Sequence, residues 1–139
     1  MDQEDRLRIA SDEDILAARQ VGRSVAMRLG FSTVDATLIA TAISELARNI
    51  LAYAEVGEIW IQAVSGTSWD GVEPRRGIQV LAQDQGPGIR DVQQALRDGF
   101  STSGSLGLGL PGVRRLADEF HIVSEENRGT TVTIRKWQS

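Results

Sequence analysis

Cysteine is absent from this chain of 139 residues, and histidine occurs once, as His121. The lack of cysteine excludes disulfides, cysteine-ligated zinc, iron–sulfur clusters and thiol catalysis. A single histidine also makes a histidine-based metal site or a histidine-centred catalytic triad hard to build. Cysteine chemistry is therefore excluded, and chemistry that needs several imidazoles is disfavoured.

Long apolar runs are missing as well, and none approaches the roughly 18 residues that a membrane span needs. The first ten residues, MDQEDRLRIA, are charged and do not contain the apolar core of a signal peptide. Basic residues are outnumbered, since 15 Lys and Arg stand against 19 Asp and Glu, a net charge of −4. That balance argues against a broad nucleic-acid-binding face. We therefore expect a cytoplasmic protein that binds neither a membrane nor a nucleic acid.

The hydrophobic pattern predicts a single domain, residues 1–139, because the length is that of one domain and no linker or repeat interrupts it. Helical spacing of apolar residues predicts a helix from Ser11 or Asp12 to Gly30, and a second from Ser32 or Thr33 to about Ala54. The apolar stripe of the first helix comprises Ile15, Leu16, Ala18, Val21, Val25 and Leu29, and that of the second Leu38, Ala42, Ile43, Leu46 and Ile50.

Alternating apolar residues predict strands at 6–10, 58–64, 77–82, 121–126 and 130–136. The strands at 58–64 and 77–82 should pair antiparallel around a long, turn-rich loop. We also expect one or two helical turns over 92–96 and a helix opened by glycines over 107–120. Long helices combined with these strands predict an α+β, two-layer sandwich, with helices packed on one face of a mixed, mostly antiparallel sheet.

Glu45 and Asn49 lie four residues apart in the second predicted helix, so their side chains share one helical face. An acid and an amide on one face could hold a water molecule or Mg²⁺, which prefers oxygen ligands. Such pairs also arise by chance in most helices. Taken alone, the pair therefore favours an ordinary solvated face.

Asp84 follows a predicted strand and precedes two spaced glycines, Gly86 and Gly88. The glycines allow a tight turn, and a carboxylate at a strand end can accept a hydrogen bond from an exocyclic amine such as that of adenine. A plain turn is an equally good explanation of the segment DQGPG by itself.

A glycine-rich stretch from Gly104 to Gly112 leads into the last predicted helix. Glycines at a helix N-terminus present free backbone N–H groups, which suit phosphate. The stretch has no GK[ST] sequence of a P-loop and differs in position and spacing from a Rossmann fingerprint. A flexible loop beside a closely packed helix is the alternative, and the later pair Gly129–Thr130 is by itself a common turn.

The order and spacing of these motifs together resemble the GHKL fold, the ATP-binding fold shared by gyrase, Hsp90, histidine kinases and MutL, over nearly the whole chain. The resemblance implies that Asp84 contacts adenine, that Asn49 binds Mg²⁺ and that Glu45 is the general base. The residues that it implies for nucleotide binding are Asn49, Asp84, Gly86, Gly88, Ser101, Thr102, Ser103, Gly104, Gly107, Leu108, Gly109 and Thr130.

Four segments place the resemblance within one group of GHKL proteins. This group is the small bacterial serine/threonine kinases of the anti-sigma and stressosome-switch type. The similar segments are AISELARNI at 42–50, AQDQGPGI at 82–89, DGFSTSGSLGLGLPGVRRLADEF at 98–120 and the ending IRKW. That family implies ATP and Mg²⁺ as cofactors and a STAS-domain protein as the substrate. It further implies that the released kinase activates a regulator such as a PP2C-type phosphatase.

Two other functions stay open. One is an anti-sigma factor that sequesters a sigma factor and phosphorylates its STAS antagonist. The other is an ATP-gated scaffold without turnover, against which the intact Glu45, Asn49 and Asp84 argue. Arg48 and Arg97 could add positive charge near the phosphates, although the sequence does not show where either side chain lies relative to them. Trp69 and Trp137 mark either a partner surface or the padding of a sheet edge.

Overall fold

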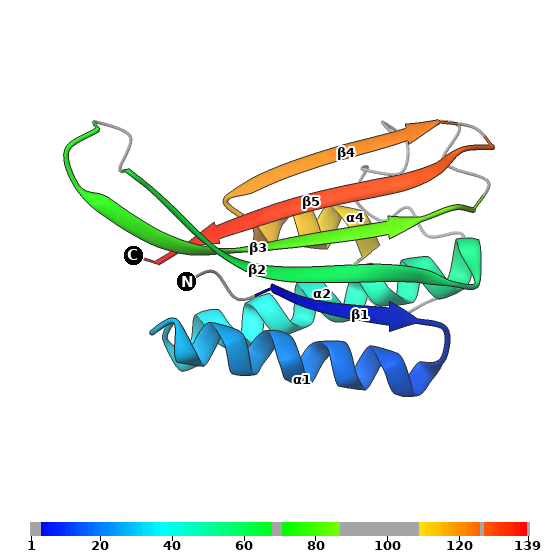
Figure 1. Ribbon diagram of the computed structural model, residues 1–139, viewed down its shortest axis with the longest axis horizontal. Coiled ribbons are helices and arrows are strands. Elements are labelled where there is room, and N and C mark those ends of the chain that lie inside the picture. Colours follow the sequence, from blue (N-terminus) through cyan, green and yellow to red (C-terminus); the bar gives the residue numbers. More distant parts are fainter. Residues whose placement is uncertain (1–3, 68–70, 87–108, 126, 139) are drawn as a thin grey trace.

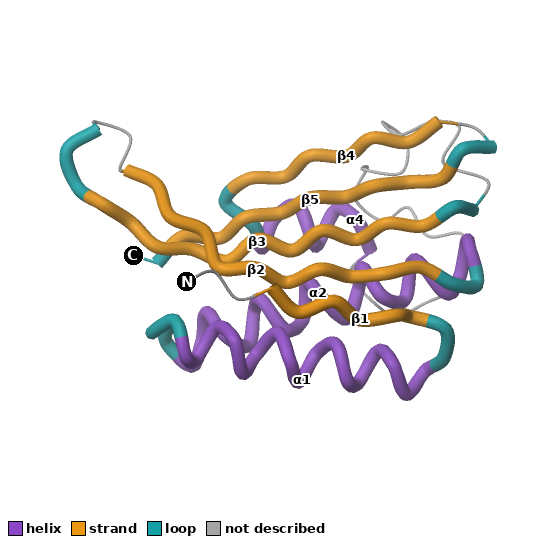
Figure 2. Tube along the Cα trace, in the orientation of Figure 1, coloured by secondary structure: helices purple, strands orange, loops and turns teal. Residues whose placement is uncertain are grey.

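Two layers, one of helices and one of strands, make up the protein in a computed structural model that describes residues 4–67, 71–86, 109–125 and 127–138. The helices cover one face of the sheet, and the other face carries no helix among the described residues (Figures 1 and 2). The helices are α1 (Asp12–Arg28), α2 (Thr33–Ala54) and α4 (Gly109–Leu116). The strands are β1 (Glu4–Ile9), β2 (Gly57–Thr67), β3 (Pro74–Asp84), β4 (Glu119–Glu125) and β5 (Gly129–Trp137).

The five described strands form one sheet in the order β1-β2-β3-β5-β4, and each neighbouring pair is antiparallel. Side chains on the helical side are buried, as at Ile59 and Ile61 of β2 and Val80 of β3. Residues between them on the same strands point to the open face, as period-2 alternation requires. The predicted α+β sandwich, with helices on one face of the sheet, is confirmed.

Both long helices begin where the sequence predicts. The Ser11 hydroxyl accepts a hydrogen bond from the Asp14 amide at 3.4 Å, and the Ser32 hydroxyl accepts one from the Asp35 amide at 3.1 Å. These side chains satisfy amides that have no partner within the helix. After α1, Gly30 takes a φ of +93°, a conformation that glycine adopts without strain.

Two assignments to the buried stripes were wrong. Leu16 is 61% exposed, because it lies one residue, or about 100°, away from the buried line formed by Ile15 and Ala18. In α2 Leu38 is only half-buried, whereas its neighbour Ile39 is buried. The two helices pack closely at Gly22, where an added Cβ would lie 2.1 Å from the Ile43 side chain.

The central hairpin extends further than its apolar residues predict. Its antiparallel register continues to Thr67 opposite Pro74, beyond the last residues that pair with β1 or β5. The Trp137 ring packs where Gly66 and Gly77 leave room for it, with the Arg75 guanidinium 4.0 Å above the ring centroid. Trp137 therefore pads the sheet, and Trp69 lies outside the described residues.

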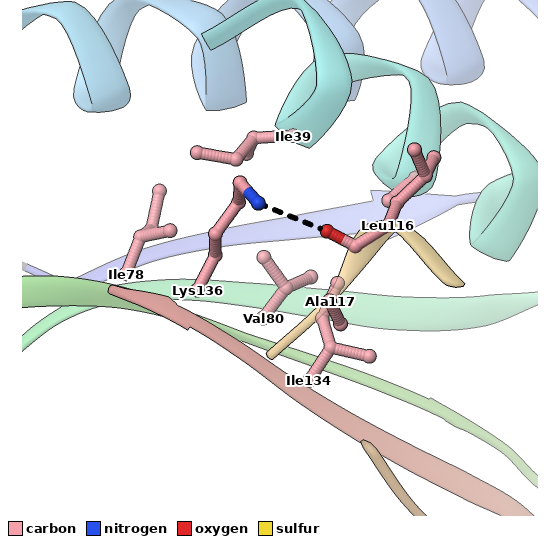
Figure 3. A pocket seen from close by; sticks show the side chains of 8 residues that line it. Ile39, Ile78, Val80, Leu116, Ala117, Ile134 and Lys136 are labelled. Atoms are coloured by element: carbon pink, nitrogen blue, oxygen red, sulfur yellow. Dashed lines mark hydrogen bonds between the residues drawn. The ribbon is translucent and has the colours of Figure 1, made fainter. Parts of the chain in front are cut away.

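The last helix is shorter than the predicted 107–120. It ends at Leu116 because the chain turns to pair with β5, where the Asp118 amide donates to the Arg135 carbonyl at 2.9 Å. Lys136 also donates from Nζ to the Leu116 carbonyl at 3.2 Å, next to a small apolar pocket between α2, α4 and the sheet (Figure 3). No candidate site residue lines this pocket. The predicted turns over 92–96 lie outside the described residues.

Candidate functional site

Glu45 is a buried acid in the middle of α2. It is only 5% exposed, and both of its carboxylate oxygens are hydrogen-bonded. Oε1 accepts from Nη1 of Arg48 at 2.7 Å, and Oε2 accepts from the backbone N–H of Gly109 at 3.2 Å. Gly109 is the first residue of α4, so this carboxylate connects the two helices at the end of the glycine-rich stretch.

Asn49 lies one turn after Glu45 on α2 and is half-buried. Within the described ranges there is no cluster of three or more His, Asp or Glu side chains that could hold a metal by itself. Mg²⁺ does not need such a cluster, because it keeps several waters and is usually held by one or two protein oxygens together with phosphate oxygens. The Asn49 amide oxygen therefore fits a magnesium ion that arrives with a nucleotide.

Asp84 ends β3 and is flanked on both sides by paired strands, with Gly57 of β2 opposite it on one side and Thr130 of β5 on the other. Its Oδ1 accepts a hydrogen bond from the Gly86 amide at 2.9 Å. Partial burial raises the pKa of Asp84, and the backbone N–H groups of Gly86 and Thr130 oppose that rise. The result is a half-buried acceptor fixed at the end of a central strand.

Two glycines allow the chain to pack tightly around Asp84. A Cβ on Gly86 would lie 2.6 Å from the Cβ of Ala54 at the end of α2. A Cβ on Gly129, whose φ is +93°, would lie 2.1 Å from the Asp84 carbonyl oxygen. Both spacings are closer than side chains tolerate, so the turn after β3 and the start of β5 require glycine. The turn after Asp84 thus lies against the C-terminal end of α2.

The structure brings several of the predicted site residues together in two groups along α2. Glu45 meets Gly109 at the start of α4, and Asp84 is grouped with Gly86 and Thr130 at the end of α2. The Thr130 hydroxyl is 2.8 Å from the Ser124 hydroxyl, a partner that the sequence did not indicate. The candidates outside the described residues are Gly88, Ser101, Thr102, Ser103, Gly104, Gly107 and Leu108, together with Arg97.

Arg48 is a partner of Glu45 that the motifs did not indicate. Its guanidinium is bonded to Glu45, three residues earlier on the same helix. The signal was present, since an acid and an arginine at i and i+3 face each other on a helix. The motifs contain Asn49 rather than Arg48, and for Arg48 the sequence predicts only added positive charge near the phosphates.

The described part of the site combines an acid and an amide on α2 with an aspartate at the end of β3. A family model described as "Histidine kinase-, DNA gyrase B-, and HSP90-like ATPase" matches residues 34–138. The chain belongs to this family of ATPases, which confirms the predicted GHKL membership and the use of ATP.

Within the family, the chain is similar to two kinds of bacterial regulator. It is 50% identical to the serine/threonine-protein kinase RsbT of Bacillus subtilis (strain 168), over 99% of this chain and 98% of that protein. It is 29% identical to the anti-sigma F factor of Geobacillus stearothermophilus, over 91% of this chain and 86% of that one. The predicted enzyme class, a serine/threonine protein kinase, is confirmed by the first of these relatives.

Solved structures show the same fold at low sequence identity. A chain of the SiaB–SiaC complex from Pseudomonas aeruginosa superposes with a TM-score of 0.54 and 14% identity, covering 97% of this chain and 89% of that one. The mycobacterial sensor histidine kinase MprB gives a TM-score of 0.50, also at 14% identity, with 97% of each chain covered. Separately, none of the described helices combines the length and apolar character needed to cross a membrane.

Proposed function

We propose that this kinase is a single cytoplasmic domain that phosphorylates a serine or threonine of a STAS-domain protein and thereby changes partners. The released kinase then activates a downstream regulator, such as a PP2C-type phosphatase. The observation that carries the proposal is Glu45, a buried carboxylate beside the first amide of α4 and one turn before Asn49. The 50% identity to a serine/threonine-protein kinase over nearly the full chain supports it.

The proposed site is elongated along α2. Asp84 accepts a hydrogen bond from the adenine amine and lies two residues before Gly86, which packs against Ala54 at the end of α2. Glu45 lies nine residues before Ala54 on the same helix. The nucleotide contacts both carboxylates, with its adenine at Asp84 and its phosphates near Glu45. The other residues we propose for nucleotide binding are Asn49, Gly86, Gly88, Ser101, Thr102, Ser103, Gly104, Gly107, Leu108, Gly109 and Thr130.

Phosphoryl transfer requires little covalent chemistry from the protein, which acts mainly by positioning the reactants and stabilising charge. The substrate hydroxyl oxygen forms a bond to the γ-phosphorus, the bond from that phosphorus to the β-phosphate oxygen breaks, and ADP leaves. Glu45 accepts the hydroxyl proton, while the Gly109 amide donates to phosphate oxygen at the N-terminus of α4. Asn49 would hold Mg²⁺, which would supply positive charge to the phosphates.

A transfer assay tests this function. The kinase is incubated with labelled ATP, Mg²⁺ and purified STAS-domain proteins from the same organism, and the products are located by mass spectrometry. We expect one serine or threonine in one STAS domain to be phosphorylated, with no label on His121. Absence of transfer to every STAS-domain protein, despite ATP binding, would contradict the proposal.

The second candidate is an anti-sigma factor that phosphorylates its STAS antagonist, and the similarity to anti-sigma F factors favours it. The two functions differ in what the free kinase binds. Affinity purification after phosphorylation of the STAS protein should recover a phosphatase if the kinase is a switch. Recovery of a sigma factor instead would establish the second candidate.

The proposed role of Asn49 as a Mg²⁺ ligand predicts that ATP binding depends on the metal. ATP at about 100 times its Kd should stabilise the protein by about 2.7 kcal/mol, and Mg²⁺ should lower that Kd in the wild type. Asn49→Asp changes the charge beside the metal, so its thermal shift should respond differently to replacement of Mg²⁺ by EDTA. Gln20→Glu, which adds the same charge at an exposed position of α1, is the control. Identical shifts with and without Mg²⁺ in all three proteins would exclude a metal role for Asn49.

A further inference from the structure

The two hydrogen bonds of Glu45 differ in length and in the charge of the donor. The bond from Arg48 joins two opposite charges at 2.7 Å, whereas the bond from the Gly109 amide is longer, at 3.2 Å, and its donor is neutral. Charge-assisted hydrogen bonds are the shorter and stronger kind. The Glu45 side chain is 6% exposed and that of Arg48 is 49% exposed. Arg48 therefore approaches the buried acid from the solvent side and compensates its charge.

We propose that Arg48 is a positioning residue for phosphoryl transfer, holding Oε1 of Glu45 so that Oε2 is presented to the substrate hydroxyl. The inference rests on the proposed function, which makes Glu45 the base. Oε2 now accepts from Gly109. A nucleotide phosphate bonded to that amide takes the place of Oε2, and the freed oxygen then accepts the hydroxyl proton.

Arg48 is needed because a glutamate has several rotatable bonds. Once the Gly109 bond is exchanged, the bond from Arg48 is, among the described residues, the one hydrogen bond that still fixes the direction of the carboxylate. The planar guanidinium has donors in fixed directions, which an ammonium lacks. A base displaced by about 1 Å can cost on the order of 10²-fold in rate. Fixing Oε1 therefore determines how well Oε2 is placed to accept the hydroxyl proton.

A direct contact between Arg48 and phosphate is the competing role, and it predicts different kinetics. A phosphate ligand contributes to ATP affinity, so its loss raises the Kd for ATP. A positioning residue acts only through Glu45, so its loss lowers kcat and leaves ATP affinity unchanged. The present geometry favours positioning, since Nη1 of Arg48 is bonded to the carboxylate.

The experiment compares Arg48→Ala and Arg48→Lys with the wild type, using the STAS-domain protein phosphorylated in the transfer assay. For Arg48→Ala we expect kcat to fall about 5- to 20-fold, while KM for that protein and the calorimetric Kd for ATP stay unchanged. Arg48→Lys should restore part of kcat. The matched control is Arg6→Ala, which breaks an equally short 2.7 Å ion pair to Glu58 and should leave kcat unchanged.

A double mutant separates positioning from an independent effect. In a Glu45→Gln background, Arg48→Ala should cause no further loss of kcat, because residues that act as a unit are not additive. An additive loss, a weaker Kd for ATP with normal kcat, or a normal kcat in Arg48→Ala would each overturn the positioning role. Wild-type transfer in Glu45→Gln alone would overturn the base assignment itself, so the two failures are distinguishable.

Discussion

Glu45→Gln should lower phosphoryl transfer to the STAS-domain protein by about 10²-fold while ATP binding is retained. The amide keeps the shape of the side chain but cannot accept the hydroxyl proton. Loss of a general base commonly costs about 10²–10⁴-fold, and the lower end applies because the transition state of phosphoryl transfer is loose. Single-turnover transfer and calorimetric titration with ATP measure the two quantities.

The same variant should hold its unphosphorylated partner for longer. A phosphoserine adds about 1.5–2 negative charges, and we expect these charges to drive release next to the nucleotide phosphates. Glu13→Gln, at an exposed position in the first turn of α1, is the control for a general change of charge. Wild-type transfer in Glu45→Gln would remove Glu45 from the mechanism, and equal affinity for both forms of the partner would remove the switch.

Asp84→Asn should weaken ATP binding by about 10- to 150-fold, which corresponds to about 1.5–3 kcal/mol for a charge-assisted hydrogen bond. The asparagine amide keeps one acceptor oxygen, but it loses the charge that strengthens the bond to the adenine amine. Calorimetric titration with ATP gives the affinity, and Asp12→Asn, at the exposed start of α1, is the control. Unchanged affinity in Asp84→Asn would refute the adenine contact.

Stability should respond to Asp84→Asn in the opposite direction. Burial raises the pKa of Asp84, so the folded state favours the protonated acid. Above that raised pKa the ionised carboxylate lowers the free energy of unfolding, and the loss disappears as the pH falls below the usual aspartate pKa. The neutral asparagine should therefore leave the melting temperature at pH 7 equal or higher. A melting temperature that drops sharply would show that the carboxylate is structural.

The elements that could be predicted from the sequence are those with local signals. Ser11 and Ser32 cap their helices as expected, because an N-cap depends on residues within one turn. Leu16 was misplaced because two adjacent apolar residues fit a helical stripe equally well, and only packing against a partner decides between them. The ends of the central hairpin were misjudged because backbone pairing continues where apolar alternation stops.

The sequence motifs indicated candidate site residues but not the contacts between them. Asp84 and Glu45 were identified by motifs, whereas the pairing of Glu45 with Arg48 and Gly109 is a tertiary arrangement. The bond to Gly109 joins residues 64 positions apart, and no local pattern predicts such a contact. The contact on which the proposed positioning role of Arg48 rests is therefore visible only in the fold.

Because β3 is hydrogen-bonded on both sides, we expect amide hydrogen exchange to differ between the two ends of the proposed site. Amide protons of central strands exchange only when much of the protein opens, whereas shorter peripheral elements open locally at a lower free energy. Asp84 ends the strand paired to both β2 and β5, and Gly109 begins a helix of eight residues. We therefore expect the amides at the proposed adenine-binding end to exchange as slowly as those of the sheet, and the amides of α4, at the proposed phosphate-binding end, to exchange faster through local opening.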